Sequence, residues 1–320
     1  MWFDAPIGYV TNTRQWGIER LNDPDAWQTW WKDPATRLVH FIGKDNVPFH
    51  AVIFPAMLMG QRDFILPDQV VGNEYLNIFN RRTGQSEKGS KSKGNMISVR
   101  WALDHLPVDA IRYYLCAIAP ESKDADFDWD DLMNRYNGEL CDVVGNFIHR
   151  SLTMTWKNFE GRVPRPGELE AEDVAMVDAI STYATDIADA LETFRFRLAI
   201  ERFIDLGRRG NVYFDAMKPW VTRKTDPVRT ATTLHVCFRA VRALGVFMTP
   251  FLPHASARLA EILGLSLPKG GPEGGPDGWN LALEPVEPGT PFGEPRALFP
   301  KLDPDQVTTL AEQHLQGQAS

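Results

Sequence analysis

The hydrophobic period of this chain changes near residue 130, and this change limits the possible folds more than any other feature of the sequence. From there on, apolar residues recur every three or four positions, as on one face of an amphipathic helix. The longest series predicts one long helix and comprises Val174, Val177, Ile180, Ala184, Ile187, Leu191, Phe194 and Leu198. Shorter series run through 132–147 and 234–248. Consecutive amphipathic helices of this kind predict a helical bundle.

Residues 1 to about 129 instead contain short apolar runs separated by Gly and Pro. Runs that are partly β-branched or aromatic, with polar or turn residues at their ends, predict strands. Such runs lie at 2–9, 38–43, 51–54 and 69–71. Helices are expected between and after them, at 55–60 and 107–119. The sequence therefore predicts the fold class α/β plus all-α.

The composition of the C-terminal part differs from that of both preceding regions. The stretch PKGGPEGGPDG at 268–278 is too rich in Pro and Gly for regular structure and predicts a mobile loop. An extended tail and a short terminal helix are expected after it. We therefore expect divisions at 1–129, 130–265 and 266–320, and a length of 320 residues suits about two domains.

Composition excludes several classes of protein. With a net charge of -8 and a pI of about 5.4, the chain cannot hold nucleic acid by overall charge, so such a partner would be bound by a local patch. Cys116, Cys141 and Cys237 form no CxxC pair, which argues against a disulfide framework or a zinc site and favours a reducing cytoplasm. The longest apolar stretch, at 49–59, is too short to span a membrane.

The sequence KGSKSKGN, from Lys88 to Asn95, is the most informative motif. Its cations and hydroxyls alternate with glycines, so the loop could bring ammonium and backbone N–H groups close to a polyphosphate. For an isolated match, a solvated basic turn or a flexible linker would be the better explanation. The motif alone does not establish a phosphate-binding loop.

Two further stretches offer groups for a small ligand. In HFIGKDNVPFH, Asp45 follows an apolar run directly, where α/β sheets bind ligands, and Gly43 lets a nucleotide approach the backbone. Asp45 could also be a helix cap, and His50 an ordinary core histidine. In WFDAPIGY, Trp2 and Tyr9 could line a pocket for a thioether side chain, or could simply be core aromatics.

In their order along the chain, these motifs resemble the methionyl-tRNA synthetases, which are class I aminoacyl-tRNA synthetases. The resemblance rests on WFDAPIGY, FIGKDNVPFH, VIFPAMLMG, GNEYLN, KGSKSKGN, IRYYL and DFDWDDL, and continues through NVYFDAMKPW, PFLPHAS and GWNLALEP. It covers all but about the last fifteen residues. It implies the second half of a Rossmann-like class I catalytic domain with the basic signature loop, followed by a helical anticodon-binding bundle.

The resemblance also implies a role for individual residues. Those matching the catalytic triphosphate loop are Lys88, Ser90, Lys91 and Ser92, with Gly89 where the family usually has Met or Phe. Those implied to bind ATP are Gly43, Asp45, Asn73, Glu74 and Lys91. Those matching the methionine pocket are Trp2, Tyr9 and His50.

In the helical half, the resemblance implies that Asn146, Arg150 and Trp220 read the CAU anticodon. Asn146 and Arg150 are four residues apart and would share a helix face. An indole can stack on an unpaired base, while Asn and Arg can hydrogen-bond to base edges. Asn146 could otherwise be a surface amide, and Trp220 a core aromatic.

The implied reaction is activation of methionine by ATP with Mg²⁺, followed by transfer to tRNA(Met), in the cytoplasm. No zinc is expected within these residues. The family's His-Ile-Gly-His sequence and its cysteine-bearing insertion are not found, so we expect a fragment of the synthetase, with the missing N-terminal half supplied in cis or in trans. The alternative is a non-catalytic tRNA-binding fragment.

Overall fold

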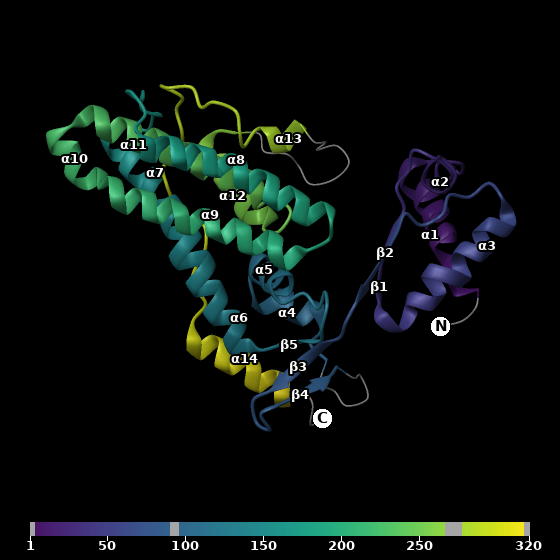
Figure 1. Ribbon diagram of the computed structural model, residues 1–320. Helices are drawn as coiled ribbons and strands as arrows, with labels where there is room; N and C mark the ends of the chain where they lie inside the picture. The colour runs from purple at the N-terminus through teal and green to yellow at the C-terminus, as the bar shows by residue number, and fades with distance from the viewer. Residues whose placement is uncertain (1–3, 90–95, 266–276, 317–320) are drawn as a thin grey trace. The chain divides into compact units, whose positions relative to one another are not determined.

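The computed structural model describes residues 4–89, 96–265 and 277–316. The chain divides into two compact units. The first unit contains Met1–Asn77 and Pro120–Ala125, and the second contains Ile78–Ala119 and Asp126–Ser320. Figure 1 labels the helices and strands of both units.

The first unit is built on two parallel strands, β1 (Val39–Gly43) and β2 (Gln69–Asn73). In their register Gly43 lies opposite Asn73, so both strands end at the same edge. The helical elements around them are η1 (Ala5–Ile7), α1 (Gly8–Trp16), η2 (Gly17–Leu21), α2 (Trp27–Trp31), η3 (Lys44–Asn46), η4 (Phe49–Ile53) and α3 (Phe54–Gln61). The core of this unit is a cluster of Trp31, Phe54 and Leu58.

Two strand predictions in the first unit are wrong. The run at 51–54 lies in η4 and at the start of α3, where the buried side chains are His50, Phe54 and Leu58. They are four residues apart, which is a helical period rather than a strand period. Residues 5–9 are helical as well, because Pro6 occupies the first turn of a helical segment, where its missing N–H costs nothing. By contrast, the predicted strands near 38–43 and 69–71 are confirmed.

A small sheet with the strand order β4–β3–β5 lies where the two units meet along the sequence. Its strands are β3 (Leu76–Asn80), β4 (Gln85–Lys88) and β5 (Ala125–Phe127). The chain crosses from the first unit to the second within β3 and returns near β5. The sheets of this protein are thus small, and most of the described residues are helical.

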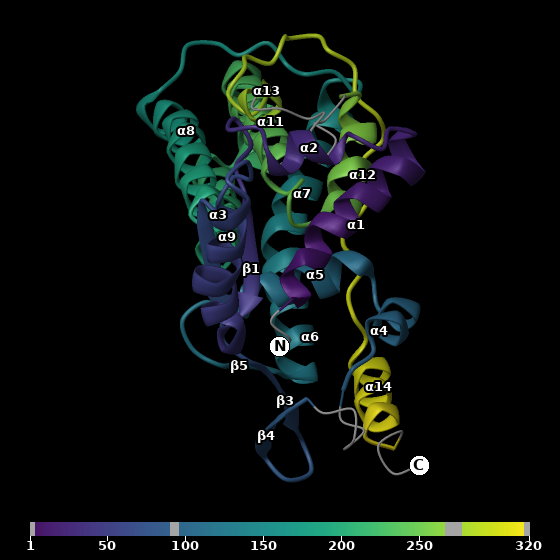
Figure 2. The same ribbon diagram turned by 90° about the vertical axis from the view of Figure 1, so that its right-hand side faces the viewer.

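The second unit is a helical bundle around α11 (Pro227–Phe247), which is buried along almost its whole length. The other helices of this unit are α4 (Val99–His105), α5 (Val108–Ala117), α6 (Trp129–Arg135), η5 (Tyr136–Gly145), α7 (Asn146–Asn158), α8 (Ala171–Glu192), α9 (Phe196–Met217), α10 (Pro219–Thr225), α12 (Pro253–Leu263), α13 (Asp277–Asn280) and α14 (Pro304–Gln316). Both views show α8 beside α9 (Figures 1 and 2). The predicted helical bundle is confirmed.

The single helix predicted over 174–198 is wrong. Two helices replace it, because the chain turns at 193–195, where Phe194 has a φ of 59°. Leu198 therefore belongs to α9. The predicted helix at 107–119 and the terminal helix are confirmed as α5 and α14, whereas most of the predicted loop at 268–278 lies outside the described residues.

Candidate functional site

The carboxyl edge of the β1–β2 pair carries a cluster of polar side chains. Gly43 and Asn73 end the two strands, Asp45 lies in η3 directly after β1, and Glu74 directly follows β2. The structure thus brings together the predicted nucleotide-binding residues of this unit. Such an edge is where open α/β sheets bind their ligands.

Three residues that the sequence did not single out hold this edge together. Lys44 forms ion pairs with Glu74 and, at 3.2 Å, with Asp124. The Tyr75 hydroxyl donates a hydrogen bond to Asp45, and the Tyr75 backbone N–H donates to Asp124 at 3.0 Å. Lys44 and Tyr75 adjoin predicted residues, but Asp124 lies 80 positions from Lys44 and had no local signal.

These contacts change the ionisation of the cluster. The hydrogen bond to Glu74 is the main cause that raises the pKa of Lys44. The Tyr75 backbone N–H, followed by Lys44, lowers the pKa of Asp124. Around neutral pH Lys44 and Asp124 are therefore both charged, and their ion pair holds them in position at this edge.

Tyr9 and His50 form a second cluster in the first unit. The Tyr9 hydroxyl lies 2.9 Å from Nε2 of the buried His50, and Nδ1 of His50 lies 2.9 Å from the Asn46 carbonyl. A carbonyl only accepts, so Nδ1 carries the proton and Nε2 accepts from the Tyr9 hydroxyl. Trp2, predicted for the same pocket, lies outside the described residues.

His40 and Phe54 extend this cluster and were missed by the sequence analysis. The His40 ring lies 5.7 Å from that of Tyr9 and 5.3 Å from that of His50, while Phe54 lies 6.2 Å from Tyr9. Burial, with a smaller contribution from His50, lowers the pKa of His40. A wall of aromatic and imidazole rings suits an apolar or thioether side chain.

Lys88 lies at the end of β4 in the second unit. The other predicted residues of the basic loop, Ser90, Lys91 and Ser92, lie outside the described residues.

An aromatic and cationic cluster lies where α7 meets α9 and α10. The Arg150 guanidinium lies 4.2 Å from the centre of the Phe214 ring and donates to Asp215 at 2.6 Å. Trp220 stacks on Phe214 with ring centres 5.8 Å apart, and its side chain is 38% exposed. Arg150 and Trp220, predicted to act together, therefore share one surface.

The third predicted residue of this surface, Asn146, lies one helical turn from Arg150. Its amide donates to Asn211 at 3.4 Å, and Asn211 donates to the carbonyls of Val143 and Gly207. The sequence analysis missed the supporting roles of Asn211, Phe214 and Asp215, although all three lie in the NVYFDAMKPW motif. We call Asn146, Arg150, Phe214, Asp215 and Trp220 the stacking surface.

Across residues 4–89, 96–265 and 277–316, no group of three or more His, Cys, Asp or Glu side chains is arranged to hold a metal ion. Among the helices in those ranges, none is long and apolar enough to cross a membrane.

Comparison with known families identifies the class. The family "tRNA synthetases class I (M)" matches residues 1–152, and the "Anticodon binding domain of methionyl tRNA ligase" matches residues 163–319. The predicted fold class, part of a class I aminoacyl-tRNA synthetase catalytic domain followed by a helical anticodon-binding domain, is thereby confirmed. Within this class, the chain belongs to the methionyl-tRNA synthetase family.

Individual relatives and solved structures are similar to this chain and belong to the same family. The chain is 41% identical over 327 residues to the methionine–tRNA ligase of Salinibacter ruber, covering 98% of this chain and 45% of that protein. It is 37% identical over 318 residues to that of Pyrococcus abyssi, of which it covers 42%. The Mycobacterium tuberculosis methionyl-tRNA synthetase in complex with methionyl-adenylate matches 93% of this chain and 55% of that one, with a TM-score of 0.77 and 30% identity. The chain thus spans less than half of these two curated relatives.

Proposed function

We propose that the chain is part of a methionine–tRNA ligase, which activates methionine with ATP and transfers it to tRNA(Met) during translation in the cytoplasm. The observation that carries this proposal is the gathering of Gly43, Asp45, Asn73 and Glu74 at one sheet edge in a chain of this family. The solved relative bound to methionyl-adenylate supports the same substrates.

In the first step, the methionine carboxylate attacks the α-phosphorus of ATP and pyrophosphate leaves. The protein contributes positioning and electrostatic stabilisation rather than a nucleophile. Gly43 and Asp45 hold the ribose, Asn73 and Glu74 lie beside the adenine, and Tyr9 hydrogen-bonded to His50 faces the methionine sulfur, together with Trp2. Mg²⁺ arrives with ATP as part of the substrate, held mainly by phosphate oxygens.

The basic loop stabilises the triphosphate in this proposal. Lys88 and Lys91 supply cations, while Ser90 and Ser92 supply hydroxyls to the departing pyrophosphate. Lys91 is the residue to test first, since an ammonium group contributes most where negative charge develops.

The stacking surface binds the anticodon in this proposal. Trp220 offers an exposed indole face backed by Phe214, and Arg150 adds a positive charge over the same rings. Aromatic stacking and Arg contacts are the usual means of binding unpaired bases. Because the chain carries a net charge of -8, this local surface supplies the affinity that overall charge cannot.

We further propose that the rest of the catalytic domain acts with this chain, in cis or in trans. The chain's coverage of 45% of a relative supports this. Large apolar residues exposed in the first unit also support it, since burying them against a further part of the domain would stabilise the unit. They include Ile7, Trp16, Ile18, Leu21, Trp30, Phe41, Val52, Met59 and Leu66.

Methionine-dependent ATP–pyrophosphate exchange tests the catalytic proposal. We expect exchange by a chain extended N-terminally to the family's full length, and a strong loss of it with Lys91→Ala. An unchanged rate in that variant would refute the phosphate role of the loop. Strong exchange by the 320 residues alone would refute the need for a further part.

A second candidate function is a non-catalytic tRNA-binding fragment. The observation that favours it is that the stacking surface lies wholly within the second unit. Binding of a tRNA(Met) anticodon hairpin without exchange activity by any extended chain would favour this alternative over the ligase.

A further inference from the structure

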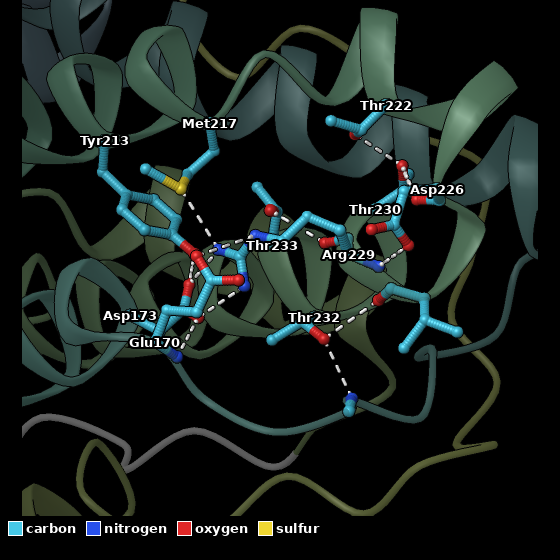
Figure 3. Close-up of polar contacts among 12 residues, drawn as sticks. Glu170, Asp173, Tyr213, Met217, Thr222, Asp226, Arg229, Thr230, Thr232 and Thr233 are labelled. Atoms are coloured by element: carbon cyan, nitrogen blue, oxygen red, sulfur yellow. Dashed lines mark hydrogen bonds and ion pairs between the residues drawn. The ribbon is translucent and has the colours of Figure 1, made fainter.

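A buried ion pair joins the starts of two helices of the bundle (Figure 3). Asp173 lies in the first turn of α8 and is fully buried, and Arg229 lies in the first turn of α11 with its side chain 12% exposed. Arg229 donates to both carboxylate oxygens of Asp173, at 2.6 and 2.5 Å. Two parallel hydrogen bonds of this kind restrict direction as well as distance.

The end of α9 is tied to the same pair. The Tyr213 hydroxyl donates to Asp173, and the Met217 sulfur lies 3.1 Å from the Arg229 guanidinium (Figure 3). Among the described residues, the only other carboxylate within 4.0 Å of the Arg229 guanidinium is that of Glu170, whose backbone N–H also donates to Asp173 at 2.9 Å. The ion pair thus fixes the last two turns of α9 against α8 and α11.

The helix corner that presents Trp220 directly follows this anchored end. Helix α9 ends at Met217, Lys218 adopts a left-handed conformation with a φ of 46°, and Pro219 begins α10. On its far side, α10 is tied to α11 by hydroxyls of Thr222 and Thr230 that lie 2.6 Å apart. The corner is therefore held at both ends by contacts to α11.

Neighbouring residues of α9 link the ion pair to the stacking surface. Tyr213 is buried and donates to Asp173, while the next residue, Phe214, stacks on Trp220 and lies under Arg150. A shift or rotation at the end of α9 would therefore move Phe214 and the indole that rests on it. The position of the exposed ring therefore depends on a buried carboxylate, through Tyr213 and Phe214.

We propose that Asp173 and Arg229 are positioning residues for anticodon recognition, which act by fixing the α9–α10 corner that carries Phe214 and Trp220. This inference rests on the proposed tRNA-binding function. It adds that part of the affinity for unpaired bases is set by the buried pair. A pair that only stabilised the bundle would affect folding but not base discrimination.

The test measures binding of an RNA hairpin with a CAU loop, and of one with those three bases permuted, to the 320-residue chain and its variants. Asp173→Asn should weaken binding of the CAU hairpin about tenfold and reduce the preference over the permuted hairpin. Circular dichroism at the assay temperature confirms that each variant is folded. Trp220→Ala should weaken binding at least as much.

Asp109→Asn is the matched control. Asp109 is also a buried carboxylate of the second unit; it accepts from the Ala255 backbone N–H at 2.6 Å and lies 3.8 Å from Arg258. Both of these partners lie in α12 rather than in α9 or α10. This variant should lower the melting temperature yet leave CAU binding within about twofold of the wild type.

The outcomes separate the two proposals. Wild-type binding and discrimination by folded Asp173→Asn would overturn the positioning role. If Trp220→Ala binds like the wild type, the anticodon function itself fails, whatever the ion pair does. If Asp173→Asn does not fold, Tyr213→Phe and Arg229→Lys test the positioning role instead. Each of these variants keeps both buried charges and removes only part of the contact. Wild-type discrimination between the two hairpins by both variants would overturn the proposal.

Discussion

At the scale of single residues, Asp173 shows how a buried carboxylate couples stability to pH. Burial alone would raise its pKa, but hydrogen bonds from Arg229, Tyr213 and the Glu170 backbone lower the pKa below its ordinary value. A depressed pKa means that ionised Asp173 stabilises the fold above the unfolded value, about pH 4, and that this contribution is lost as pH falls through the lower folded value.

We therefore predict that Asp173→Asn lowers the free energy of unfolding by about 3 kcal/mol at pH 7, because Arg229 keeps a buried charge without its counter-ion. The difference between the wild type and the variant should shrink as pH falls below about 4, where Asp173 is protonated in the unfolded chain, and on through the lower pKa of folded Asp173. Urea unfolding from pH 2.5 to 7 would measure this. A difference that stays constant across that range would contradict the assignment.

Two tyrosines of the first unit allow a paired prediction. Tyr9→Phe removes the hydroxyl that donates to His50, so the KM for methionine should rise about fivefold, which corresponds to about 1 kcal/mol. Tyr75→Phe removes the donor to Asp45, so the KM for ATP should rise instead. Exchange assays on an extended chain would separate the two. Equal changes in both constants for both variants would mean that the clusters do not bind different substrates.

The sequence predicted the candidate site residues better than it predicted the distant residues that contact them. Asp45 and His50 stood out because both lie in the motif HFIGKDNVPFH, and Arg150 because the family resemblance implied a role for it. Asp124 and Asp173 did not, because their partners Lys44 and Arg229 are 80 and 56 positions away. Such pairs arise only when helices and strands pack, and one sequence does not contain that information.

At the scale of elements, two glycines let α9 closely approach η5 and α7. A Cβ on Gly210 would lie 2.6 Å from the buried Phe147 ring, and a Cβ on Gly207 would lie 3.0 Å from Val144. This close approach of α9 brings Asn211 and Asp215 to Asn146 and Arg150. The stacking surface therefore depends on Gly207 and Gly210, because a side chain at either position would push α9 away from η5 and α7.

We predict that Gly210→Ala destabilises the protein by about 1–3 kcal/mol, because the clash outweighs the better helix propensity of Ala. The control is Gly138→Ala, an exposed position in η5 with no atom within 4 Å of the added Cβ among the described residues. That variant should gain up to about 1 kcal/mol. Urea unfolding measures both, and a stabilised Gly210→Ala would contradict this packing argument.

The wrong predictions at 51–54 and 174–198 have separate physical causes. The run at 51–54 is apolar at every position, so its period could not distinguish a strand from a helix. In the structure Phe54 packs on Trp31 from a helix, and that contact lies far away in the sequence. The break at 193–195 was hidden because the apolar spacing continues through the turn into α9. The amphipathic helices elsewhere were predicted because their apolar stripes face one core.

At the scale of the whole molecule, the two units differ in how much of each is buried. The core of the first unit centres on Trp31, Phe54 and Leu58, and much apolar surface stays exposed. The second unit encloses α11 almost completely. The division expected at residue 130 stays a prediction, and it falls inside the continuous helical stretch α6–η5–α7.

A unit with a closed core should fold without its neighbour. We predict that residues 76–320, which keep β3 whole, unfold cooperatively and bind the CAU hairpin within about twofold of the 320-residue chain, because every residue of the stacking surface and of the Asp173–Arg229 pair lies in the second unit. In the 320-residue chain, the first unit should melt in a separate, earlier transition, since little apolar surface is buried there. Calorimetry on both chains would measure this. A single transition in the longer chain, together with lost binding in the shorter one, would mean that the first unit helps to hold the stacking surface in place.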